Sequence, residues 1–177
     1  ILWALMHFLF PFLQTVMMEK WSMDISPYYL QTGTFFLMLI PMMMGMVYGF
    51  ILLDERDGGI ITAISVTPTG KTGYLELRLS IPMALSFMFI LLFLILLRLT
   101  GSLDILQVLV ISLLVSSQSL ILLLVLGAFA ANKVMGLAIS KGFGILLMGP
   151  LLDYALPAPL HWIGSYSPFF WARRALL

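Results

Sequence analysis

The stretch Thr34–Gly59, "TFFLMLIPMMMGMVYGFILLDERDGG", decides the fold, because twenty uncharged residues are followed at once by four charged ones. A helix that crosses the hydrocarbon core of a bilayer needs about 20 mostly apolar residues. Backbone amides inside hydrocarbon must bond to one another, which favours a helix over any open structure. We therefore expect a membrane-spanning helix over Thr34–Leu53 that leaves the bilayer at Asp54.

The composition of the whole chain supports a membrane environment. Of its 177 residues, 62% are hydrophobic and only 10% are charged, whereas about a quarter are charged in ordinary soluble domains. The chain has no cysteine, which excludes disulfides and thiolate metal sites, and its two histidines are too isolated to predict a metal centre. A net charge of +1 without a basic patch gives no indication of nucleic-acid binding.

Hydropathy divides the chain into five apolar runs, and together they predict an all-α, polytopic helical bundle forming a single transmembrane domain over residues 1–177. The predicted spans are residues 1–18, 34–53, 81–97, 105–131 and 134–152. The chain begins inside an apolar run and ends at "ARRALL", so we expect a sixth span beyond the residues given. Residues 153–174, which contain several Trp and Tyr, are expected to form a short interfacial or re-entrant segment.

The Lys and Arg residues predict how the bundle is oriented, since cytoplasmic links carry an excess of positive charge. Links that follow the second and fourth spans share one side of the membrane. That side and its adjoining span end carry five basic residues, and the other side carries four: Arg56, Lys71, Arg78, Lys133 and Lys141 against Lys20, Arg98, Arg173 and Arg174. This bias favours a cytoplasmic position for residues 54–80.

The link after the second span combines a charged beginning with glycine and proline residues. Asp54, Glu55, Arg56 and Asp57 mark the exit from the membrane, where we expect Glu55 and Arg56 to be hydrated and to form at most an exposed ion pair. Two glycines permit a sharp turn, and an apolar side of a short helix follows before a terminating Thr-Pro pair: Gly58, Gly59, Ile60, Ile61, Ile64, Thr67 and Pro68. The apolar side could rest on lipid headgroups or bind a groove of a soluble partner.

This pattern resembles the membrane domain of the type-2 ABC exporter family, in which the second span ends in a Glu-Arg pair before glycine, aliphatic residues and a Thr-Pro-like pair. The residues that carry the resemblance here are Glu55, Arg56, Gly58, Gly59, Ile60, Ile61, Val66, Thr67 and Pro68. A looser match lies toward the C-terminus, at Asn132, Gly149, Pro150, Leu156, Pro157, Pro168, Trp171 and Arg174. The resemblance extends over about residues 35–177.

The resemblance implies a six-span permease that works as a homo- or heterodimer and exports an amphipathic or hydrophobic substrate, such as a drug, lipid or peptide. Residues 54–74 would contain a cytoplasmic coupling helix that docks on a separate ATP-binding subunit, which would hold ATP and Mg. The sequence contains no catalytic motif, so we expect neither an enzyme nor a cofactor in this chain. The expected location is the plasma membrane of a bacterium or archaeon. A non-transporting membrane scaffold or a channel-forming subunit is the alternative.

Two groups of residues are candidates for a translocation path: Met43, Met46, Ser112, Ser116, Gln118 and Ser119. Methionines could give a flexible lining for varied apolar substrates or bind copper(I), but adaptable packing explains them equally. The serines share one face of the fourth predicted span and could instead pack against another helix. Gly45 and Gly49 form a small-xxx-small pair, which predicts a close contact with a neighbouring helix.

Overall fold

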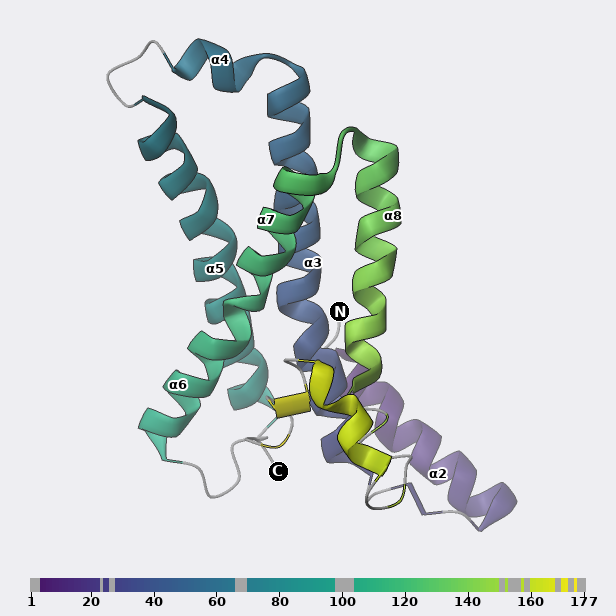
Figure 1. Cartoon of the computed structure of the whole chain (residues 1–177). Helices are drawn as coiled ribbons and strands as arrows, with labels where there is room; N and C mark the ends of the chain where they lie inside the picture. Colours follow the sequence, from purple (N-terminus) through teal and green to yellow (C-terminus); the bar gives the residue numbers. More distant parts are fainter. Residues whose placement is uncertain are drawn as a thin grey trace.

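The computed structural model describes residues 4–22, 24–25, 28–65, 70–97, 104–149, 152, 157, 160–167, 170–171 and 174. Within these ranges every regular element is a helix, and Figure 1 shows their arrangement. The elements are the π-helix η1 (Leu5–Leu9), α2 (Phe10–Trp21), α3 (Tyr29–Asp57), α4 (Ile60–Ile64), α5 (Gly70–Leu96), α6 (Ile105–Ser116), α7 (Gln118–Phe129), α8 (Lys133–Phe143), and the 3-10 helices η3 (Gly144–Leu147) and η4 (Leu160–Tyr166).

Three helices in the described part of the chain are long and apolar enough to cross a membrane. They cover Gln31–Asp57, Thr72–Leu96 and Ile105–Phe129, with mean hydropathies of 2.2, 2.6 and 2.5. The second, third and fourth predicted apolar runs overlap these helices, and the chain is an all-α, multi-pass membrane protein.

The first and fifth predicted spans are each divided between two or more helical elements in the described residues. The described part of the first predicted span falls mainly in η1 and α2, of five and twelve residues, and that of the fifth falls mainly in α8, of eleven residues, and in η3. A straight crossing needs about 20 residues, so these two spans stay predictions.

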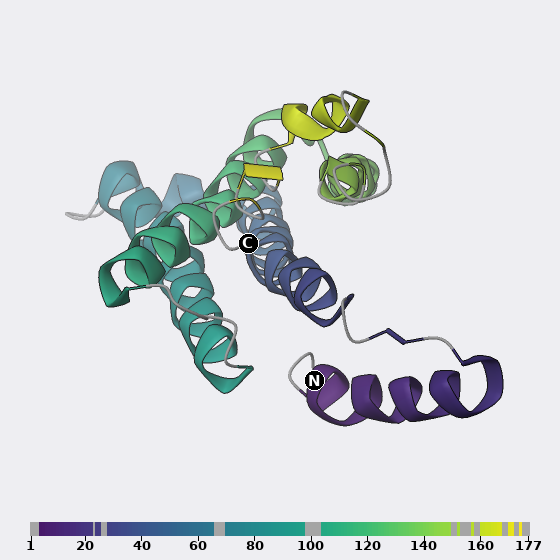
Figure 2. The same ribbon diagram turned by 90° about the horizontal axis from the view of Figure 1, so that it is seen from below.

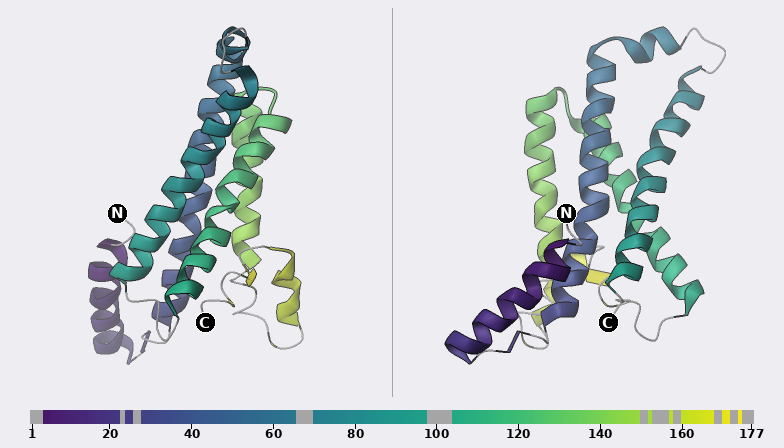
Figure 3. Two further views of the ribbon diagram at one scale, coloured as in Figure 1. Left: turned by 90° about the vertical axis from the view of Figure 1, so that its left-hand side faces the viewer. Right: turned by 180° about the vertical axis from the view of Figure 1, so that it is seen from behind.

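The links between helices fall at two opposite ends of the bundle. Figure 1 shows α4 and the link between α7 and α8 at one end, with α2 and η4 toward the other. Figure 2 shows α2 lying beside the bundle rather than within it, and Figure 3 shows the same separation from two more sides. The alternation of links predicted from hydropathy is therefore confirmed for α4 and the α7–α8 link.

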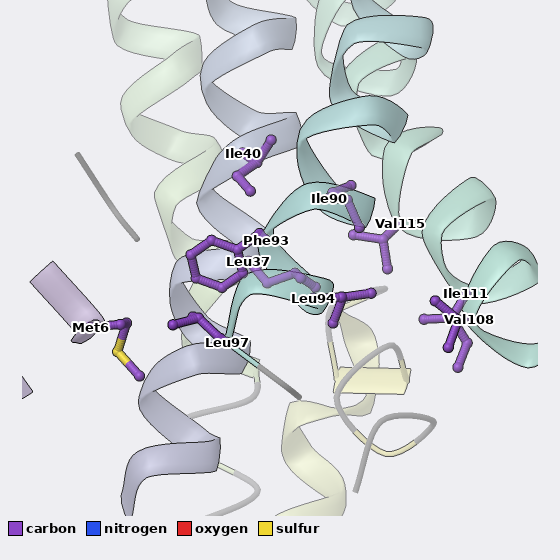
Figure 4. Close-up of a cluster of buried hydrophobic side chains, with 10 residues drawn as sticks. All are labelled: Met6, Leu37, Ile40, Ile90, Phe93, Leu94, Leu97, Val108, Ile111 and Val115. Atoms are coloured by element: carbon purple, nitrogen blue, oxygen red, sulfur yellow. The ribbon is translucent and has the colours of Figure 1, made fainter. Parts of the chain in front are cut away.

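A hydrophobic cluster joins η1, α3, α5 and α6 at the end away from α4 (Figure 4). Its buried members are Met6, Leu37, Ile40, Ile90, Phe93, Leu94, Leu97, Val108, Ile111 and Val115. Because lipid tails are as apolar as these side chains, close van der Waals packing rather than transfer from water holds such helices together in a membrane.

The most extensive helix contact, between α3 and α7, depends on glycine. A Cβ atom at Gly45 would lie 2.5 Å from the carbonyl oxygen of Ser119, and one at Gly49 would lie 2.5 Å from Cδ1 of Leu126. The two backbones approach closely only because these positions have no side chain. The prediction of a close helix contact at Gly45 and Gly49 is confirmed.

Candidate functional site

The last turn of α3 forms a network that we call the charged junction: Asp54–Asp57 and the groups they bind on α5, α7 and α8. Glu55 is directed to α5, where the Nε of Arg78 donates a hydrogen bond of 2.8 Å to Oε2, and the Arg78 guanidinium also pairs with Oε1. The hydroxyl of Tyr74 donates to the same carboxylate. One carboxylate of α3 thus binds two residues of α5, on the far side of the α4 link.

The placement of Glu55 corrects the expectation of a hydrated carboxylate. The side chains of Glu55 and Arg78 are only 16% and 18% exposed. Sequence proximity suggested Arg56 as the partner, but helix geometry directs adjacent residues to different neighbours. A covered, multiply bonded carboxylate is costly to leave unpaired, unlike the exposed pair expected from the sequence.

Arg56 binds the C-terminal end of α7. Its guanidinium donates to the carbonyl oxygens of Ala130 at 2.8 Å, Ala131 at 3.0 Å and Gly127 at 3.5 Å. The last carbonyls of a helix have no partner within the helix, and they carry the negative end of its dipole. Arg56 therefore supplies both the donors and the positive charge that the end of α7 lacks.

The other two charges of the junction lie nearer to solvent. Nζ of Lys133, the first residue of α8, lies 2.5 Å from Oδ1 of Asp54, and the two side chains are 60% and 53% exposed. The hydrogen bond to Asp54 and the charge of that carboxylate raise the pKa of Lys133 above its ordinary value. Asp57 accepts a hydrogen bond of 3.4 Å from Nε of Arg56. The end of α3 is thus joined to three other helices.

The short helix α4 follows Gly59, whose φ of +72° favours glycine. Gly58 has an ordinary right-handed conformation, and no residue of α4 is buried. The side chains predicted to form one apolar face differ in exposure: Ile60 is 45% exposed, whereas Ile61 and Ile64 are half-buried.

Ile61 is turned toward the bundle. It lines a cavity of about 280 Å³ together with residues of α3, α5 and α7. The lining residues are Leu52, Leu53, Arg56, Ile61, Leu75, Leu124, Gly127 and Ala128. Ile60 is thus the candidate for an outward contact, and Ile61 for an inward one.

The boundaries of the predicted coupling segment also differ in the structure. Asp54–Asp57 complete α3, and residues 70–74 form the first turns of α5, so that both spanning helices extend beyond their apolar runs. Hydropathy places the end of a span where polar residues begin, but the helix continues into water as long as its backbone remains hydrogen-bonded. Thr67 and Pro68 lie outside the described residues.

The candidates for a translocation path do not line one surface. Met43 is 57% exposed, and Met46 and Gln118 are half-buried. In contrast, Ser112, Ser116 and Ser119 are fully buried. A path that combines these residues stays a prediction.

The buried serines have contacts that favour helix packing. Ser116 and Ser119 donate to carbonyl oxygens three residues earlier, at 2.8 and 2.7 Å. Ser112 Oγ has no hydrogen-bond partner among the described residues. Side-chain bonds to the preceding turn often bend a helix, and the boundary between α6 and α7 lies within this group, at Ser117.

Sequence reasoning missed three residues of the charged junction: Tyr74, Arg78 and Lys133. A signal was present, since Arg78 and Glu55 are opposite charges near the facing ends of two consecutive spans. It missed as well the role of Asn132, whose side-chain oxygen accepts a hydrogen bond of 2.9 Å from the Met135 amide and caps α8. Asn at the start of a helix is a common cap.

The C-terminal part contains an aromatic group with an arginine. The guanidinium carbon of Arg174 lies 4.6 Å from the ring centre of Trp162 and 4.7 Å from that of Phe170. Trp171 packs against both rings. These residues fall in the predicted interfacial segment of residues 153–174, at the end of the bundle opposite α4.

Comparisons with known proteins give a consistent result. The family model described as "Fluoroquinolones export permease protein Rv2686c-like" matches residues 1–177. Two curated relatives are the fluoroquinolones export permease proteins Rv2686c and MT2760, from the H37Rv and CDC 1551 strains of Mycobacterium tuberculosis. Each is 25% identical over 170 residues, covering 93% of this chain and 66% of the relative. The chain therefore spans slightly less than two thirds of the length of these relatives. No solved structure matches significantly. The match along the whole chain shows that it belongs to the Rv2686c-like family of fluoroquinolone export permeases.

Proposed function

We propose that this chain is the membrane-spanning permease part of an ATP-driven exporter that moves amphipathic drugs, fluoroquinolones among them, out of a bacterial cell. The observation that carries the proposal is the family match from residue 1 to residue 177. The curated relatives are named as fluoroquinolone export permeases. Three membrane-competent helices agree with a permease.

The energy source in this proposal is a separate ATP-binding subunit that holds ATP and Mg, as in type-2 ABC exporters. The support from the structure is α4, a short helix without buried residues that connects two spanning helices at one end of the bundle (Figure 1). Its exposed Ile60 is an apolar contact for a soluble partner on the cytoplasmic side. A second permease copy completes the exporter.

Fluoroquinolone accumulation in cells tests the export function. Cells that produce the full-length protein together with its ATP-binding subunit should retain less drug than cells with the empty vector. The difference should disappear when cellular ATP is depleted. Equal drug content in both cell types contradicts export and favours a scaffold or channel subunit. Export that persists without ATP contradicts the energy source.

Co-purification tests the partner. Ile60→Asp places a charge on the outward side of α4 without entering the bundle, and it should reduce recovery of the ATP-binding subunit. Ile60→Val keeps an apolar surface and is the matched control. If both variants recover the subunit equally well, α4 does not dock through Ile60.

A further inference from the structure

The contacts of α4 raise the question of what fixes its position on the bundle. It has five residues, none of them buried, and it begins after Gly59 with φ of +72°. The described helix that follows, α5, begins at Gly70 with φ of +60°. Ile61, the inward side chain of α4, borders a cavity of about 280 Å³. Tight packing transmits displacement well, but here the apolar contact beneath α4 is incomplete.

The polar contacts at the end of α3 are, in contrast, specific and directional. Glu55 binds α5 through Arg78 and Tyr74, and the Glu55–Arg78 pair is largely covered. Charge-assisted bonds of this kind fix both distance and orientation, since the planar guanidinium meets both carboxylate oxygens. This contact fastens α3 to α5 directly across the α4 link.

Arg56 connects the same end of α3 to a third helix, α7. Its bonds to three carbonyl oxygens at the end of α7 depend on the fork of donors in a guanidinium, which a lysine cannot reproduce. Because Glu55 and Arg56 are adjacent on one helical turn, any rotation of that turn moves both contacts together.

We propose that the charged junction is the element that positions α4 and through which its movement reaches α5 and α7. Glu55 holds α5 through Arg78, and Arg56 holds the end of α7. Arg78 and Arg56 are thus positioning residues for transport. The inference rests on the proposed function, in which α4 receives movement from the ATP-binding subunit. The exposed Asp54–Lys133 pair has a minor part, because exposed pairs are weak and screened by salt.

Distances between spin labels test the positioning directly. The chain has no cysteine, so Thr62→Cys on α4 and Leu137→Cys on α8 give one labelled pair, measured by double electron–electron resonance in lipid nanodiscs. Both side chains are exposed and lie outside the junction. The wild-type junction should give a narrow distance distribution. Arg78→Glu should broaden it at least twofold, because two carboxylates then face each other.

Charge exchange separates positioning from a general loss of structure. Glu55→Arg combined with Arg78→Glu restores an opposite pair and should return the distribution to near the wild-type width. Glu76→Gln, on the exposed side of α5, is a matched control and should leave it unchanged. The proposal is overturned if Arg78→Glu keeps the wild-type width. It is overturned equally if the exchanged protein stays as broad as the single variant or fails to accumulate.

The second contact is tested at Arg56 with the labels at Thr62 and at Ile121 on α7, whose side chain is exposed and does not line the cavity beneath α4. Arg56→Met keeps most of the unbranched stem of the side chain but removes every donor, and it should broaden the distribution more than Arg56→Lys. Equal and narrow distributions for both variants would refute the contact to α7.

These measurements need neither drug nor ATP. If the wild-type protein exports no drug, the proposed function is contradicted but the spin-label distances are unaffected. If the variants keep the wild-type distance distribution, only the role of the charged junction is contradicted. In exporting cells, Arg78→Glu should lose at least tenfold in export rate and the exchanged protein should recover most of it. An exchanged protein with wild-type distances but no recovery of export would show that the junction does not transmit movement.

Discussion

Replacing Gly45 with alanine places a methyl group 2.5 Å from the carbonyl oxygen of Ser119 and 3.0 Å from Cβ of Leu122. The nearest atom belongs to the backbone of α7 and cannot rotate away, so α3 and α7 must separate locally until the contact reaches an ordinary 3.4 Å or more. A gap of 0.5–1 Å already forfeits roughly a quarter to a half of each dispersion contact along the seam. Overpacking of this kind costs about 1–3 kcal/mol of unfolding free energy.

Gly142 on α8 offers a matched control, because a Cβ there meets nothing within 4 Å. Alanine favours a helix over glycine by up to about 1 kcal/mol, and this gain is shared by both variants. The difference between Gly45→Ala and Gly142→Ala therefore isolates the clash, and we expect it to be about 1–3 kcal/mol, or roughly five- to 140-fold in the folding equilibrium. Titration from a mild detergent into SDS, followed by tryptophan fluorescence, measures it. Equal unfolding free energies for the two variants would refute the close contact between α3 and α7.

Three more substitutions and one labelling experiment extend these expectations. Gly49→Ala should cost less than the change at position 45, since the nearest atom is the end of a leucine side chain that can move; an equal or larger cost in the same titration contradicts this. Ser112→Ala removes a buried hydroxyl that has no hydrogen-bond partner among the described residues, so stability should be unchanged or rise by about 1 kcal/mol; a clear loss would reveal a partner. Asn132→Ala should lower the unfolding free energy by about 0.5–2 kcal/mol through loss of the α8 cap, and serine at that position should retain most of it. In intact cells, a cysteine at Thr62 in α4 should be protected from an impermeant thiol reagent and one at Leu160 in η4 should react, since α4 and η4 lie at opposite ends of the bundle; the reverse pattern overturns a cytoplasmic α4.

The sequence predicts the parts of this fold that depend on local composition. Uninterrupted apolar runs identify the three long helices, and the spacing of Gly45 and Gly49 identifies a close helix contact before the partner is known. The buried serine face of α6 and α7 is also visible as a period of three to four residues. Each of these features can be recognised within the sequence of a single helix.

The partners within the charged junction depend instead on how helices are arranged in space. The run Asp54–Asp57 does not by itself reveal which helix each charge binds. The partners of Arg56 could not be predicted from the sequence, because they are backbone carbonyls and carry no residue-type signal. The separate exposures of Ile60 and Ile61 likewise depend on where α4 sits over α3 and α5.

The Glu55 and Arg56 contacts of the charged junction also differ in the sequence separation between their members. The partners of Glu55 follow it by 19 and 23 residues, whereas the carbonyl acceptors of Arg56 follow it by 71 to 75. The members of the Glu55 contact are therefore all synthesised before α7 is. The Arg56 contacts form only after α6 and α7 have been made, because their acceptors are residues 127, 130 and 131. This order of synthesis allows an α3–α5 hairpin to form with the Glu55 contact closed before α7 supplies the acceptors of Arg56.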